Sequence, residues 1–216
     1  MSKHQAARRE QRASAATADF TRAQIADAID RAVRDVTGTD GVGHCAIYAL
    51  AGAVVANIVT GDEYLPQAGK LVVAASTGTD DGGDYTDYME MDPVAGRADG
   101  HNRDGQNSEF HAWAVRVPRR ARQGELYVLG DDDVLMDLSF HHMPLWAQRF
   151  REDWWQRSDW PPYFWGTVRE LRALDVQLQT DEQTTAEMLA HPGNSDLTFL
   201  VAKAAMGLLH LPAAGG

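Results

Sequence analysis

The sequence has one cysteine, Cys45, and few basic residues. A single cysteine cannot form a disulfide within the chain, so nothing in the composition indicates an oxidising compartment. Only 20 of the 216 residues are Lys or Arg, against 31 Asp or Glu, and the formal net charge is -11. This balance is opposite to that of nucleic-acid-binding proteins. We therefore expect neither nucleic acid nor an anionic membrane surface as a partner.

Long hydrophobic runs are also missing. The longest apolar stretch, residues 45–59, is short for a membrane-spanning helix and contains Asn57. The first residues lead into no apolar segment of the secretory type. We therefore expect a cytoplasmic protein that does not enter a membrane. The length fits a flexible polar arm over residues 1–18 and a single domain over residues 19–216.

The apolar stretch that starts at Cys45 is the most informative part of the chain. It follows a glycine-rich loop, residues 37–43, and it is apolar on every side, as is typical of a buried helix. Cys45 would lie in the first turn, where unpaired N–H groups and the positive end of the helix dipole favour a thiolate. An earlier helix that ends near Gly38 is predicted by one apolar stripe: Ile25, Ile29, Ala32, Val33 and Val36.

Three later segments have the pattern of an antiparallel meander. In residues 109–117 the odd positions, among them His111 and Trp113, share one face of a strand. Residues 125–130 and 134–140 should form the next two strands.

The other parts of the chain carry weaker patterns. Residues 70–75 predict a short strand, and residues 76–108, rich in Gly, Asp, Asn, Pro and Ser, predict a long loop broken by a short strand near residues 85–89. Such a loop is a surface insertion or the rim of a functional cleft. Helices are expected over residues 167–178 and 197–210.

The segment from His141 to Trp165 is rich in aromatic residues. Packing is the favoured role for its tryptophans, with sugar stacking or an acyl pocket as alternatives. They are Trp146, Trp154, Trp155, Trp160 and Trp165.

The sequence predicts a nucleophilic site formed by three residues: Cys45, His111 and Asp137. A cysteine nucleophile needs a base, a group that orients the base, and donors for the oxyanion that forms on attack. A helix start carries Cys45, and two strands of one predicted sheet carry His111 and Asp137. The imidazole can then face the sulfur on one side and the carboxylate on the other.

The segments Gly-His-Cys-Ala-Ile-Tyr-Ala, His-Ala-Trp-Ala-Val-Arg-Val and Leu-Met-Asp-Leu-Ser-Phe resemble the three signature segments of transglutaminase-like proteins. These belong to the papain-like cysteine superfamily, which also holds the arylamine N-acetyltransferases. The resemblance covers residues 41–140 and implies an α+β fold with a central buried helix packed on an antiparallel sheet. It implies Cys45 as nucleophile, His111 as general acid and base, and Asp137 as the orienting group.

Further site residues are expected around this centre. We take Gly43, His44 and Trp113 as candidate substrate-binding residues, with the Cys45 amide in the oxyanion hole. The chain has Thr39 where papain-type enzymes have a glutamine, and it lacks the Arg-Gly-Gly-x-Cys segment of the acetyltransferases. The second oxyanion donor is therefore unassigned, and acetyl-CoA is disfavoured.

The expected activity is hydrolysis of an amide, ester or thioester in a peptide or small-molecule acyl substrate, through an acyl-enzyme and without a cofactor. Acyl transfer on the same residues is one alternative. Another is a binding protein that retains the fold, since a lone cysteine among apolar residues is often an inert core residue. The oligomeric state is left open.

A metal site is a further alternative. Asp137, His141 and His142, with the acidic residues 131–133 nearby, offer nitrogen and oxygen ligands. Adjacent histidines on a strand would point to opposite faces, and no His-x-x-x-His pair is present. We therefore expect no metal.

Overall fold

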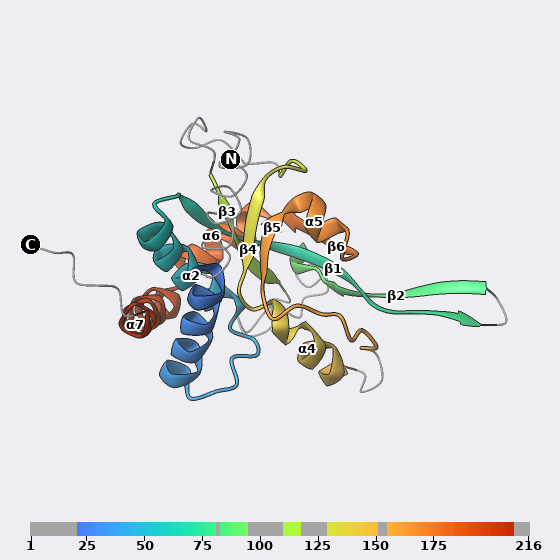
Figure 1. The fold of residues 1–216 in the computed structure, drawn as a ribbon, viewed down its shortest axis with the longest axis horizontal. Coiled ribbons are helices and arrows are strands. Elements are labelled where there is room, and N and C mark those ends of the chain that lie inside the picture. Colours follow the sequence, from blue (N-terminus) through green and yellow to red (C-terminus); the bar gives the residue numbers. More distant parts are fainter. Residues whose placement is uncertain (1–20, 81–82, 95–109, 118–128, 151–154, 210–216) are drawn as a thin grey trace, which may run out of the picture.

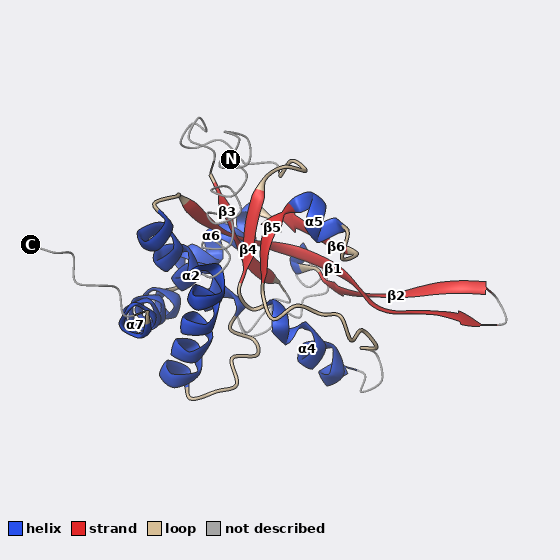
Figure 2. Ribbon diagram, viewed as in Figure 1, coloured by secondary structure: helices blue, strands red, loops and turns tan. Residues whose placement is uncertain are grey.

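The computed structural model describes residues 21–80, 83–94, 110–117, 129–150 and 155–209. Helices and one antiparallel sheet make up this part of the chain, which is the expected α+β fold (Figures 1 and 2). Residues 21–37 are helical. The elements after them are α2 (Cys45–Thr60), β1 (Tyr64–Asp80), β2 (Gly83–Met91), β3 (His111–Arg116), β4 (Val134–Asp137), the 3-10 turn η1 (Phe140–His142), α4 (Met143–Phe150), β5 (Phe164–Thr167), α5 (Val168–Arg172), β6 (Val176–Thr180), α6 (Glu182–Ala190) and α7 (Pro192–Leu208).

Strand β1 organises the sheet. The described strands follow the order β2-β1-β3-β4-β5, and β6 also pairs with β1. Gly69 is paired with both β3 and β6, and Leu71 with both β2 and β6. Strands β3 and β2 therefore lie one after the other along one edge of β1, while β6 covers the opposite edge. Beyond these pairings β1 and β2 continue as a long hairpin that leaves the body of the molecule (Figure 1).

Helix α2 is the buried centre of the fold, as its apolar sequence predicts. It contacts one face of the sheet and packs against the helix over residues 21–37 and against α7 (Figure 1). Side chains of Ile29, Val55, Ala114 and Val201 meet in this layer. The helix ends at Gly61, whose left-handed backbone (φ +71°) suits a glycine.

The opposite face of the sheet is covered by η1, α4, α5 and the tryptophan-rich segment. Trp160 stacks on Phe140 with ring centroids 4.1 Å apart, and its Nε1 donates to the Phe140 carbonyl over 2.6 Å. Trp146 and Trp155 pack on the same cluster, and Trp165 packs on the α2 side. Packing is thus confirmed for these tryptophans, while Trp154 lies outside the described residues.

Some predicted elements differ from the structure. Residues 76–80 and 83–91 form a hairpin that extends from the body of the protein, where a long loop was expected, and the short strand expected near residues 85–89 is confirmed as part of β2. The helix predicted over residues 167–178 ends at Arg172, and β6 begins at Val176 after a turn in which Asp175 has φ +53°. Of the strand predicted over residues 125–130, residues 125–128 fall outside the described residues, and Leu129 and Gly130 are not in a strand. The arm predicted over residues 1–18 also falls outside the described residues.

None of the helices in the described ranges is both long and apolar enough to cross a membrane.

Gly69 is required where β6 meets β1. A Cβ at this position would lie 2.1 Å from the Gln179 carbonyl oxygen, which is backbone and cannot move aside. We predict that Gly69→Ala lowers the free energy of unfolding by about 2–4 kcal/mol, measured by urea denaturation. Gly207→Ala is the control, since a Cβ there meets nothing within 4 Å and the change should stay within about 1 kcal/mol. Equal effects of the two substitutions would contradict this account.

Candidate active site

The loop before α2 sets the position of Cys45. Gly41 and Gly43 have φ of +86° and +89°, which L side chains rarely adopt. The His44 N–H donates to the Gly41 carbonyl over 3.1 Å and closes a tight turn directly before the helix. Cys45 is then the first residue of α2, as predicted, and its side chain is half-buried.

The first turn of α2 has spare backbone donors. The amides of Ile47 and Tyr48 both donate to the His44 carbonyl, over 2.9 and 3.1 Å. Within the described residues the structure gives no acceptor to the amides of Cys45 and Ala46. Unpaired amides at a helix N-terminus favour negative charge, so this end of α2 suits an oxyanion beside the sulfur.

His111 and Asp137 form a buried pair. His111 Nε2 lies 2.5 Å from Asp137 Oδ2, and each side chain is 1% exposed. Strand register explains the contact: Ala114 is opposite Met136 and Val115 is opposite Leu135, so His111 and Asp137 are diagonal neighbours on one face of β3 and β4.

Cys45 lies near enough to His111 to contribute to the raised pKa of the imidazole. The thiol also lies 3.7 Å from the carbonyl oxygen of Phe110, the residue that precedes β3. Because Nε2 of the imidazole faces Asp137, Nδ1 is the nitrogen left for the sulfur.

Ser139 is a site residue that the sequence analysis missed. Its backbone N–H and its hydroxyl both donate to Asp137 Oδ1, over 3.0 and 2.9 Å, and Ser139 is 2% exposed. These bonds turn the chain out of the strand, which is why β4 ends at Asp137 rather than continuing to residue 140 as predicted. The pattern Asp-x-Ser, typical of such side-chain turns, is the signal that could have found it.

The pair also sets the charge of His111. Burial by itself disfavours a charged imidazole, but the charge and hydrogen bond of Asp137, with a smaller contribution from Cys45, raise the pKa of His111 from 6.5 to about 10. The structure therefore favours a protonated His111 at neutral pH.

The candidate substrate-binding residues divide into two groups. Gly43 is exposed and His44 is half-buried, and both directly precede the sulfur. Trp113 is fully buried and stacks on His111, with ring centroids 6.3 Å apart and planes 25° apart. Trp113 thus lies beside the imidazole in the core.

His141 and His142 are arranged differently from the arrangement that the sequence predicts. His141 and His142 lie in the turn η1 rather than on a strand, so their rings do not point to opposite faces and have centroids only 3.8 Å apart. Asp137 is not beside them; Asp30, from the helix over residues 21–37, is. Burial, together with the neighbouring His141, lowers the pKa of His142 to about 4.

The chain matches no protein-family model and no curated protein sequence. The crystal structure of a structural-genomics protein is similar over 84% of this chain and 77% of that chain, with 13% sequence identity and a TM-score of 0.41. This similarity identifies no family, so function has to be inferred from the site.

The Asp137 carboxylate should control the titration of His111. A histidine with a raised pKa stabilises the fold below its ordinary pKa of 6.5, and this contribution is lost as the pH rises towards 10. We predict that Asp137→Asn lowers the pKa of His111 by more than about one unit, measured by NMR of the imidazole Cε1–H. The pH range in which stability falls should move down with it.

The resonance of His191, at the start of α7, provides the control for this titration, since its curve should be the same in both proteins. An unchanged His111 curve in Asp137→Asn would contradict the role given to the carboxylate.

Proposed function

We propose that the protein is a cysteine hydrolase of the papain-like, transglutaminase-like type, which cleaves an amide, ester or thioester through an acyl-enzyme on Cys45. The observation that carries this proposal is the His111–Asp137 contact of 2.5 Å, together with the influence of Cys45 on the same imidazole. A half-buried thiol beside a fully buried base and carboxylate leaves the sulfur as the member that a substrate can reach.

The chemistry uses groups of this chain only. His111 holds the thiol proton, and Cys45 Sγ attacks the carbonyl carbon, so that a C–S bond forms and the carbonyl electrons move to oxygen. The Cys45 amide donates to that oxyanion. Collapse breaks the bond to the leaving group, which takes the proton from His111. Water then gives a proton to His111 and attacks the thioester, and the thiolate leaves.

The substrate class is a peptide or small-molecule acyl compound. Transfer to an amine differs from hydrolysis only in the second step, in which the amine takes the place of water. A cytoplasmic setting, which keeps a lone thiol reduced, is part of this proposal.

Reactivity of the sulfur tests the proposal. We predict that iodoacetamide alkylates Cys45 rapidly at a pH of about 6, and that His111→Gln slows this at least about tenfold, because the thiolate is the reacting form. With p-nitrophenyl acetate, intact-protein mass spectrometry should find an acetyl group on Cys45. Its formation should be about 10²–10⁴-fold slower in His111→Gln.

The controls are His191→Gln, which should behave as wild type, and Cys45→Ala, which should take no label. The hydrolase proposal would be contradicted if the wild-type thiol reacted only at alkaline pH and its alkylation rate equalled that of His111→Gln. That result would favour a binding protein with an inert cysteine.

A further inference from the structure

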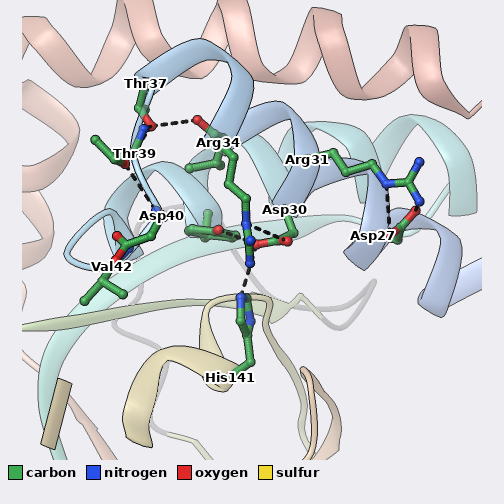
Figure 3. A network of polar contacts seen from close by, with 12 residues as sticks. Asp27, Asp30, Arg31, Arg34, Thr37, Thr39, Asp40, Val42 and His141 are labelled. Atoms are coloured by element: carbon green, nitrogen blue, oxygen red, sulfur yellow. Dashed lines mark hydrogen bonds and ion pairs between the residues drawn. The ribbon is translucent and has the colours of Figure 1, made fainter. Parts of the chain in front are cut away.

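A second cluster of chemically active side chains lies between the helix over residues 21–37 and the turn η1. Asp30, His141 and His142 each offer one metal-ligating atom, and these atoms all lie within 4.8 Å of one another. Figure 3 shows His141 reaching from η1 towards Asp30 on the helix. None of the three belongs to the site around Cys45.

The spacing of the ligand atoms suits a small cation. Asp30 Oδ1 and His141 Nε2 are 3.1 Å apart. Two ligand atoms of a tetrahedral zinc site, each about 2.0–2.1 Å from the ion, lie about 3.3 Å apart. Little movement is needed to place an ion between this oxygen and this nitrogen.

The buried Nε2 of His142 is a second, independent observation that points to a bound ligand. The residue is 4% exposed, and its buried Nε2 has no hydrogen-bond partner within the described residues. A buried nitrogen without a partner is costly, and a metal ion is one group that would satisfy it. Gly41 makes room for this ring, since a Cβ there would lie 2.9 Å from His142 Cε1.

The surroundings orient the carboxylate and supply negative charge. Arg34 Nε lies 3.1 Å from Asp30 Oδ2, and the Tyr48 hydroxyl donates to Oδ1 over 2.7 Å. Outer contacts of this kind hold ligands in place in metal sites. The charged groups near the His142 ring are the carboxylates of Asp30 and Asp40, the guanidinium of Arg34 and the His141 ring.

We propose that Asp30, His141 and His142 bind one divalent transition-metal ion of the zinc type, with one carboxylate oxygen and two imidazole nitrogens as ligands. The partial exposure of Asp30 and His141 leaves a side open for water as the fourth ligand. The ion would join two segments: the helix over residues 21–37, through Asp30, and the turn η1 that follows Asp137, through His141 and His142. Its role is structural, and it is independent of the proposed hydrolase activity.

The test uses untagged protein stripped with EDTA and then titrated with Zn²⁺ by calorimetry. Cys45→Ala removes the thiol, the one soft ligand that could bind zinc elsewhere. We expect about one Zn²⁺ per chain in wild type, Cys45→Ala and His191→Ala, and a loss of about 100-fold or more in affinity in His142→Ala and in Asp30→Asn. Zn²⁺ should raise the melting temperature only where it binds tightly.

Cobalt provides a second readout in the Cys45→Ala protein. Co²⁺ bound by nitrogen and oxygen ligands should give visible absorption bands without thiolate charge transfer, and Asp30→Asn should abolish them. The proposal is overturned if wild type binds no stoichiometric Zn²⁺, if Cys45→Ala abolishes binding, or if a folded Asp30→Asn or His142→Ala binds as wild type does.

Discussion

The buried carboxylate of Asp137 is the constraint on which the rest of the site depends. Removing a carboxylate from water costs several kcal/mol unless hydrogen bonds compensate for the loss. Here both oxygens are engaged, one with His111 and the other with the backbone and hydroxyl of Ser139. These partners come from β3 and from the turn after β4, so the strand register and the turn are fixed together by one buried charge.

The Cys45 sulfur lies near His111 because α2 and β3 begin close to each other. Side-chain alternation puts Ala112 and Ala114 under α2, and His111 and Trp113 on the opposite face of β3. Cys45 reaches the imidazole nonetheless, since it is the first residue of α2 and His111 is the first residue of β3. The small alanines allow the helix to approach the sheet closely, which brings its N-terminal amides near the strand ends.

Local patterns predicted much of this arrangement. The apolar run after Cys45 indicated a buried helix, and the alternation around His111 indicated a strand, so Cys45, His111 and Asp137 were each assigned to the kind of element in which they lie. Ser139 was missed because its role depends on a carboxylate that no local pattern shows to be buried. His141 and His142 were misjudged because a strand was assumed beyond Asp137, where hydrogen bonding turns the chain. The hairpin of β1 and β2 was missed since polar residues on a projecting arm resemble a loop in composition.

The threefold pairing of β1 has a consequence for how the chain folds. Ala68 exchanges hydrogen bonds with Thr185, which is 117 residues further along the chain. During synthesis the edge of β1 that faces β6 stays open until residues 176–180 have emerged, long after Cys45 and His111 have been made. Sheets closed by such distant partners fold slowly, and their open edges can pair with other chains in the meantime. The sheet is therefore completed late, after nearly all of the described chain is available.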